Sequence, residues 1–295
     1  MNLQQLVQEI SISQDSITRV SNAKNILIEN IKSYSSDGDF PALMETRLIG
    51  SYKRKTKIDP LNDVDIILTI GKGYYKGNNW HIIDDCSYSF SSNDYDEDQN
   101  VSSIKLLNTL REKLSATYSR SEIRRNNEVV NVYLSSYDVG FDLVPAFYYR
   151  DVDYFLIPKG NKSTKWKKTN PIKDELILDL INSKNGNKIK EVIKIAKHFF
   201  SYKRIPSLRS YHLESCAYYI FNEISGNYSI RDYLVYFYDK LDKSYINGCE
   251  DPTGISEPLS SDLDAFDIQK ITVALNEAKS ILVNSEEDYC EYVGF

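Results

Sequence analysis

The sequence predicts an α+β protein, in which a mixed sheet backed by helices is followed by a C-terminal helical lobe. Apolar and other side chains alternate along Asp63–Ile70, which is typical of a strand with one buried face. Asp138–Tyr148 is a second apolar run of strand length. Beyond Pro171 the apolar residues recur at helical spacing, most clearly at positions 189, 192, 193, 196, 199 and 200.

The first part of the chain predicts a long helix followed by a strand, a turn and a short helix. We expect an amphipathic helix over Asp15–Ser33, because apolar residues recur there every three or four positions: Ile17, Val20, Ala23, Leu27 and Ile31. Asp37-Gly38-Asp39 is typical of a turn. A short apolar run then ends in Gly50-Ser51, where we expect a strand to turn into a helix.

The middle of the chain completes the predicted sheet. Residues 71–100 are rich in Gly, Asn, Ser and Asp and indicate an irregular surface insertion, in which the acidic run 94–98 is a solvated loop. Val101–Tyr118 has helical periodicity, and Ser121–Arg125 and Val129–Leu134 indicate two paired strands. Tyr154–Pro158 and Trp166–Pro171 form a connector, after which we expect four or five helices. The predicted division is therefore residues 1–165 and residues 166–295, in one compact body.

Composition excludes several classes of protein. The chain has 295 residues, a net charge of −6 and a sequence pI of about 5.3, which argues against a duplex nucleic-acid binder. Its basic residues form three local clusters: Lys53-Arg54-Lys55-Lys57, Arg124-Arg125 and Lys165-Lys167-Lys168. We interpret these clusters as solvated surface. Around a nucleotide pocket, the first cluster could also attract triphosphates. No stretch is apolar for long enough to span a bilayer and no signal peptide is evident, so we expect a cytoplasmic protein.

The cysteines are spaced too widely to suggest a metal site. Cys86, Cys216, Cys249 and Cys290 form no C-x-x-C pair, so we expect neither a zinc site nor a disulfide framework. His198 and His212 lie in predicted helices among aromatic residues, and we interpret both as packed, neutral side chains rather than as catalytic groups.

Two aspartates separated by one residue give the first indication of a metal site. Asp63 and Asp65 point to the same face of their strand, where the two carboxylates repel each other unless a cation lies between them. Oxygen ligands favour a hard ion, so we expect Mg²⁺. Gly50-Ser51 would bind the phosphates that complete the ion's shell, because glycine permits close approach and N–H groups at a helix start attract anions. Either motif alone is more often a turn or a solvated strand end.

Together these motifs resemble the polymerase-β-like nucleotidyltransferases, in which Gly-Ser is followed about a dozen residues later by D-x-D. That superfamily requires a third carboxylate on a neighbouring strand. Asp142 meets this requirement, because it interrupts the apolar strand Val139-Gly140-Phe141-Asp142-Leu143-Val144-Pro145-Ala146-Phe147. A buried carboxylate without a partner would be costly, which supports the same assignment.

The residues in and around these motifs resemble those of one family within that superfamily, the cGAS/DncV-like nucleotidyltransferases. The matching stretches extend from about Thr46 to Glu214, with a weaker similarity at Asp251-Pro252-Thr253-Gly254. The resemblance implies a catalytic core over residues 1–165, braced by the N-terminal helix, and a helical lobe over residues 166–295 that completes the nucleotide cleft. It also implies that Lys197 and Ser210 hold triphosphate, and that Tyr211 stacks on a base. Lys194 lies one turn from Lys197 and is an alternative; from the residues alone, Lys197 is a surface lysine.

The resemblance implies a Mg²⁺-dependent enzyme that joins NTPs into a cyclic di- or oligonucleotide. Asp63, Asp65 and Asp142 would bind two Mg²⁺ ions, with Mn²⁺ as a substitute, and Asp142 would also accept the proton of the attacking hydroxyl. We expect a monomer that needs no duplex nucleic acid and no membrane, and whose product acts on a separate effector in bacterial anti-phage signalling (CBASS). The alternatives are linear nucleotidyl transfer to an RNA, protein or small-molecule hydroxyl, and a catalytically silent nucleotide-binding homologue. The bases, the linkage and the ring size cannot be read from these motifs.

Overall fold

The structure is a computed structural model that describes residues 1–36, 38, 40–76, 79–83, 92, 95, 101–149, 154–160, 162–241 and 243–295. These residues pack as two units. The sheet unit consists of Ser13–Tyr52 and Leu61–Pro171, and the helical unit consists of Met1–Ile12, Lys53–Pro60 and Ile172–Phe295. The sequence predicts a single division between residues 165 and 166, whereas the packing places two earlier segments with the helical unit.

The sheet unit contains one mixed sheet. Its elements are α2 (Gln14–Ser36), β1 (Glu45–Leu48), β2 (Asp63–Lys76), β3 (Asn79–Ile83), α4 (Ser103–Thr117), β4 (Glu122–Asn126), β5 (Val129–Leu134), β6 (Val139–Tyr149), β7 (Tyr154–Pro158) and β8 (Trp166–Thr169). The eight strands follow the order β1-β2-β6-β5-β4, with β3 paired to β2, β7 to β6 and β8 to β7. The central pair β2 and β6 is parallel and the other pairs are antiparallel, which confirms the predicted mixed sheet.

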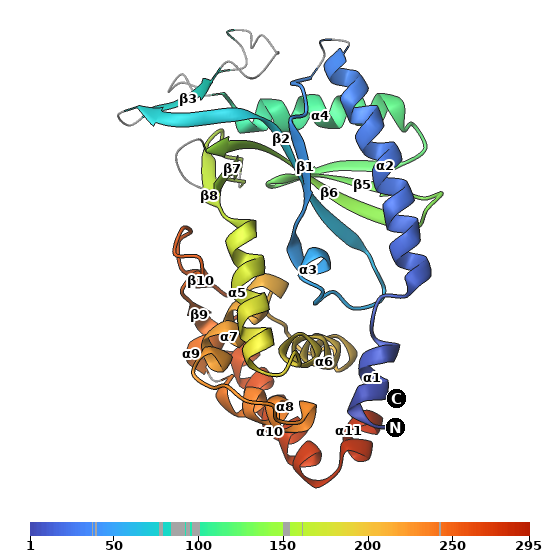
Figure 1. Cartoon of the computed structure of the whole chain (residues 1–295), viewed down its shortest axis with the longest axis vertical. Coiled ribbons are helices and arrows are strands. Elements are labelled where there is room, and N and C mark those ends of the chain that lie inside the picture. Colours follow the sequence, from blue (N-terminus) through green and yellow to red (C-terminus); the bar gives the residue numbers. More distant parts are fainter. Residues whose placement is uncertain are drawn as a thin grey trace. The chain divides into compact units, whose positions relative to one another are not determined.

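Two helices back this sheet (Figure 1). Helix α4 packs on β4, β5 and β7, and α2 packs on β6 and on α4. The predicted apolar face of α2 is buried at Val20, Ala23, Leu27 and Ile31, but Ile17 is 39% exposed, so the buried face begins one turn later than expected. Val64, Ile66 and Leu68 of β2 are fully buried, which leaves Asp63 and Asp65 on the opposite face of the strand.

The predicted irregular insertion over residues 71–100 is partly wrong. Strand β2 continues to Lys76 and pairs with β3, with Lys72 opposite Ile83 and Lys76 opposite Asn79. Strand pairing needs only backbone hydrogen bonds, so a stretch rich in glycine and asparagine can form it without a clear side-chain pattern. The acidic run at 94–98 lies outside the described residues except for residue 95, as do residues 37 and 39 of the predicted turn.

The helical unit has more helices than the four or five expected after the connector. It contains α1 (Leu3–Glu9), α5 (Pro171–Lys184), α6 (Ile189–Tyr202), α7 (Ser210–Asn222), α8 (Ile230–Lys240), α9 (Lys243–Asn247), β9 (Gly248–Cys249), β10 (Leu259–Ser260), α10 (Ala265–Asn284) and α11 (Glu286–Tyr292). Helices α9 and α11 are short. Ser285 lies between α10 and α11 and caps the N-terminus of α11, because its side chain accepts a hydrogen bond from the Asp288 amide. Helix α1 was not predicted, although Asn2 and Gln5 form a capping box there.

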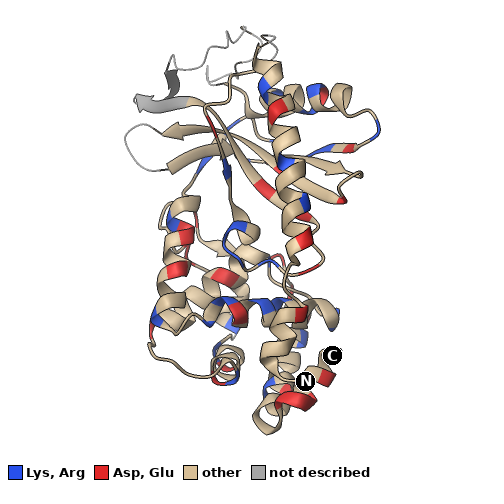
Figure 2. Ribbon diagram, turned by 45° about the vertical axis from the view of Figure 1, so that its right-hand side comes forward, with Lys and Arg blue, Asp and Glu red and all other residues tan. Residues whose placement is uncertain are grey.

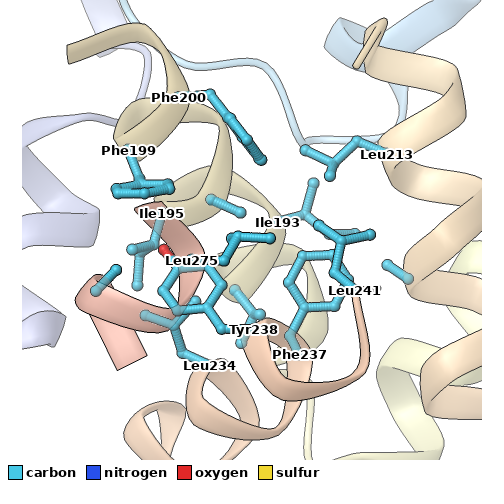
Figure 3. Packing of buried hydrophobic residues seen from close by; sticks show 14 of the residues in the cluster. Ile193, Ile195, Phe199, Phe200, Leu213, Leu234, Phe237, Tyr238, Leu241 and Leu275 are labelled. Atoms are coloured by element: carbon cyan, nitrogen blue, oxygen red, sulfur yellow. The ribbon is translucent and has the colours of Figure 1, made fainter. Parts of the chain in front are cut away.

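An apolar core holds the helical unit together (Figure 3). All six positions of the predicted apolar face of α6 are buried, including Ile193, Phe199 and Phe200. Figure 3 shows these side chains meeting residues from α7, α8 and α10, among them Leu213, Leu234, Phe237, Tyr238 and Leu275. Within the part of the chain that the structure describes, no helix is both long and apolar enough to cross a membrane.

Candidate active site

Three aspartates meet on two neighbouring strands of the sheet unit. Asp63 and Asp65 begin β2, and Asp142 lies in β6, where the parallel register places it directly opposite Asp65. One carboxylate oxygen from each of the three residues lies within 4.8 Å of the others, and all three side chains are half-buried. The structure therefore brings together the two aspartates of the D-x-D motif and the third carboxylate inferred from the family resemblance.

An asparagine that the sequence analysis did not single out orients Asp142. The Asn131 Nδ2 group donates a hydrogen bond of 2.6 Å to Asp142 Oδ1, and β5 places Asn131 opposite Asp142 in the antiparallel register. A polar residue between Val130 and Val132 is a signal that could have been noticed, but its partner on the neighbouring strand is visible only in the folded sheet.

Gly50 lies against one of the aspartates. Its φ is +69°, and a Cβ atom added there would lie 1.9 Å from Asp65 Oδ2, so only glycine fits. The Ile49 amide donates to the Asp65 carbonyl oxygen at 3.0 Å, which fixes the turn to β2. Helix α3 (Gly50–Lys53) starts at this turn, and Ser51 within it is buried. The sequence predicts a close approach of this glycine to phosphate; the close neighbour that the structure describes is the Asp65 carboxylate.

Lys197 belongs to a buried ion network in the helical unit. Its ammonium donates to Glu214 Oε1 at 2.7 Å and to the carbonyl and hydroxyl oxygens of Thr56 at 3.2 and 3.3 Å. Arg54 Nε donates to Glu214 Oε2 at 2.5 Å. Although burial raises the pKa of Glu214, the charges of Arg54 and Lys197 outweigh it and hold that pKa at about 2.

This network corrects two interpretations drawn from the sequence. Lys197 is not a surface lysine, because its side chain is only 10% exposed, and Arg54 is 7% exposed rather than solvated. A phosphate would have to reach the Lys197 ammonium beside, or in place of, its contacts with Glu214 and Thr56. Arg54 and Glu214 were missed as a pair, because 160 residues separate them in the sequence.

Tyr211 is held by two carboxylates. Its hydroxyl lies 2.6 Å from Asp174 Oδ1 and 2.7 Å from Asp251 Oδ1, and the Arg54 guanidinium lies 5.5 Å from the centre of its ring. Burial raises the pKa of Asp174 to about 6, with the nearby Asp251 charge adding to the effect. Arg54, Asp174, Tyr211 and Glu214 line one small pocket of the helical unit, together with Pro252. Ser210 is exposed at the first position of α7.

The Asp251-Pro252-Thr253-Gly254 segment has a structural role. The Asp251 carboxylate accepts hydrogen bonds from the backbone amides of Thr253 at 3.1 Å and Ser256 at 2.8 Å. Lys173 Nζ donates to the Thr253 carbonyl oxygen at 2.6 Å. These contacts fix the carboxylate that holds Tyr211.

The two helical histidines are packed as expected. His198 Nε2 lies 2.9 Å from the Val293 carbonyl oxygen, and the ring stacks on Tyr202. His212 is 4% exposed, and its Nε2 atom lies 2.8 Å from the Tyr245 carbonyl oxygen.

Comparisons with known proteins agree with this geometry. The model of the SMODS family, the Second Messenger Oligonucleotide or Dinucleotide Synthetase domain, matches residues 1–182. A probable cyclic nucleotide synthase of Bacillus cereus (strain VD146) is 28% identical over 294 residues, which cover 94% of this chain and 85% of that protein.

Solved structures with the same fold include two enzymes with bound nucleotide. Escherichia coli DncV in its 3'-deoxy GTP-bound form matches with a TM-score of 0.74 at 12% identity, over 98% of this chain and 92% of that chain. E. coli MS115-1 CdnC with ATP matches with a TM-score of 0.69 at 13% identity, over 97% and 92% of the respective chains. The predicted fold class is therefore confirmed.

Proposed function

The chain belongs to the SMODS family and is a nucleotidyltransferase that makes cyclic oligonucleotides, and we propose that Asp63, Asp65 and Asp142 are its catalytic, metal-binding carboxylates. The resemblance to cGAS/DncV-like enzymes that the motifs predict is thereby confirmed. The observation that supports the proposal for the three residues is their convergence within 4.8 Å on β2 and β6.

The donor set fits a hard divalent ion. Three carboxylates supply only oxygen ligands, and a cation between them would relieve the repulsion among three like charges this close together. We propose two Mg²⁺ ions, with Mn²⁺ as a substitute. When bound, such ions lower the pKa of an attacking hydroxyl and stabilise charge on the entering and leaving oxygens. Asn131 positions the Asp142 carboxylate, which accepts the proton of the acceptor ribose hydroxyl.

For nucleotide binding we propose Gly50 and Ser51 in the sheet unit, and Lys197, Ser210 and Tyr211 in the helical unit. The exposed hydroxyl of Ser210 at the start of α7 suits a phosphate oxygen. The fixed ring of Tyr211 suits stacking on a base, because its hydroxyl is already held by Asp174 and Asp251. Lys197 would bind a phosphate beside, or in place of, Glu214 and Thr56, which its ammonium already contacts.

The product made from all four NTPs and Mg²⁺ tests the proposal. We expect a product that resists phosphatase and whose mass equals a sum of nucleotide monophosphates minus one water each. Ring closure is favoured because a bound linear intermediate presents its own hydroxyl at high effective concentration. A dominant phosphatase-sensitive chain, or transfer only to an RNA, protein or small-molecule acceptor, would support linear transfer instead.

Asparagine variants of the three aspartates, compared with a control variant, test whether these carboxylates are catalytic. Asp63→Asn, Asp65→Asn and Asp142→Asn should each abolish product formation and leave the circular dichroism spectrum unchanged, since each removes one charge from a crowded group. Asp138→Asn is the control, because Asp138 lies on the exposed turn before β6, where its carboxylate accepts a hydrogen bond from the Tyr133 hydroxyl that an asparagine oxygen can also accept. If Asp142→Asn retains near-wild-type activity, the assignment of the third carboxylate is wrong.

We further propose that the product activates a separate effector in bacterial anti-phage signalling. Membership of a family of second-messenger synthetases supports a signalling product. A catalytically silent homologue is disfavoured because all three carboxylates are present and close together.

A further inference from the structure

A second cluster of metal-ligating side chains lies in the helical unit. His212 and Cys216 belong to α7, and Cys249 belongs to β9. One ligand atom from each of these residues lies within 4.8 Å of the others. The sequence analysis expected no zinc site, because no two cysteines are close in sequence. That expectation considers only neighbours in the sequence, whereas these three side chains come from two separate elements.

Local structure explains why the three side chains converge. Residues four apart on a helix lie on the same face, so His212 and Cys216 point the same way from α7. Strand β9 pairs with β10, with Cys249 opposite Leu259, and β9 packs against α7. A Cβ atom at Gly248 would lie 2.3 Å from the Leu259 carbonyl oxygen, so glycine allows the close pairing that places Cys249.

An independent contact prepares the histidine for metal binding. His212 Nε2 lies 2.8 Å from the Tyr245 carbonyl oxygen, which can only accept a hydrogen bond. Nε2 therefore carries a proton, and in the neutral imidazole Nδ1 holds the lone pair that a metal would take. Histidine ligands of metals usually donate their second ring nitrogen to such an acceptor, which fixes the tautomer and the ring orientation.

We propose that His212, Cys216 and Cys249 bind a zinc ion. One imidazole and two thiolates are the ligands that zinc prefers, whereas Mg²⁺ takes oxygen ligands. Tetrahedral Zn–S bonds of about 2.3 Å place two sulfur atoms roughly 3.8 Å apart, which the present separation of at most 4.8 Å approaches. His212 and Cys216 are buried and Cys249 is half-buried, so an ion can enter beside Cys249, where water would complete the shell.

The bound ion would connect two segments that flank Tyr211. Cys249 is two residues before Asp251, whose carboxylate holds the Tyr211 hydroxyl at 2.7 Å. His212 follows Tyr211 directly in α7. Zinc would therefore connect the Asp251 segment to the start of α7. The metal site itself does not depend on the proposed roles of the nucleotide-binding residues.

Metal analysis of the full chain tests the proposal. The protein should be purified under reducing conditions and dialysed against zinc-free buffer. Elemental mass spectrometry should then find one zinc ion per chain. Replacement of zinc by Co²⁺ should give the visible absorption of a tetrahedral site and the near-ultraviolet bands of thiolate-to-cobalt charge transfer. A strong chelator should lower the thermal midpoint, because metal-binding free energy contributes to folding.

Variants separate this site from adventitious binding. Cys249→Ser and Cys249→Ala alter a half-buried position and should fold, lose the zinc and lose the charge-transfer bands, as should Cys216→Ser. Cys290→Ser is the matched control, because Cys290 is a buried cysteine of α11 outside the cluster, and it should keep the zinc. Zinc well below one per chain, or zinc retained by both Cys249 variants, would overturn the proposal. So would a peptide pair linked through Cys216 and Cys249 in a non-reducing digest, which would indicate a disulfide between these two residues instead.

Discussion

Gly50 links backbone conformation to the position of Asp65, one of the three proposed metal-binding carboxylates. Its positive φ alone would favour glycine, and a Cβ atom placed 1.9 Å from Asp65 Oδ2 would force that carboxylate to move. The glycine of the Gly-Ser motif therefore has a role within the acidic cluster, besides the phosphate-binding role inferred from the sequence.

Replacement of Gly50 by alanine tests this role. We expect Gly50→Ala to lower kcat by about 100-fold or more, because the added methyl group must displace the Asp65 carboxylate. Gly38→Ala is the matched control, since Gly38 has a similar φ of +75° and nothing within 4 Å of an added Cβ. Both variants should share a destabilisation of about 1 kcal/mol from the positive φ, measured by chemical unfolding. Equal activities of the two variants would show that the clash with Asp65 is unimportant.

At the scale of elements, a buried ion network joins α6, α7 and the segment Lys53–Pro60. Glu214 of α7 accepts hydrogen bonds from Arg54, Thr56 and Lys197, and it is 4% exposed. A buried carboxylate is stable only when it is paired in this way, so removing its charge leaves two buried cations with a neutral partner. We therefore expect the network to make stability depend on pH.

The pKa of Glu214 sets the pH range of this effect. Its folded pKa of about 2 lies below the ordinary value of 4.5, so the carboxylate stabilises the fold above pH 4.5, and the contribution is lost as the pH falls towards 2. A lowering of this size corresponds to a contribution on the order of a few kcal/mol. Glu214→Gln should thus destabilise the protein most at neutral pH and progressively less below pH 4.5, measured by urea unfolding.

An exposed glutamate provides the control for this measurement. Glu257 is exposed on the helical unit, and Glu257→Gln should change the free energy of unfolding little at any pH. A destabilisation by Glu214→Gln that is the same at pH 7 and pH 3 would contradict the assigned role of the charge.

At the scale of the whole molecule, charge argues against activation by nucleic acid. The net charge is −6, and Figure 2 shows Lys and Arg interspersed with Asp and Glu along the helices of the helical unit. A protein that binds a duplex must neutralise several phosphates, which requires cations gathered on one surface.

We therefore expect long duplex DNA or RNA to leave NTP turnover unchanged. Initial rates of product formation should be equal with and without duplex at low salt, where electrostatic binding is strongest. Stimulation by duplex that disappears as salt is added would refute this expectation.

Local patterns in the sequence were sufficient to predict the strand that carries Asp63 and Asp65. The alternation along Asp63–Ile70 places two carboxylates on one face of a strand, because that periodicity is a property of the extended backbone itself. The helical spacing in α6 likewise predicts its buried face. The family resemblance then predicted Asp142 as the third carboxylate. The parallel register of β2 and β6 places Asp142 opposite Asp65.

Contacts between distant segments were decided only by the tertiary structure. Arg54 and Glu214, Asn131 and Asp142, and His212 and Cys249 carry no shared local pattern, since the partners lie on different elements. Arg54 resembles a solvated base in sequence, yet it is buried because Glu214 neutralises it there. Periodicity in the sequence indicates which face of an element is buried. Packing between elements decides which residues that face meets, and the pairing of these charged and metal-ligating side chains depends on that packing.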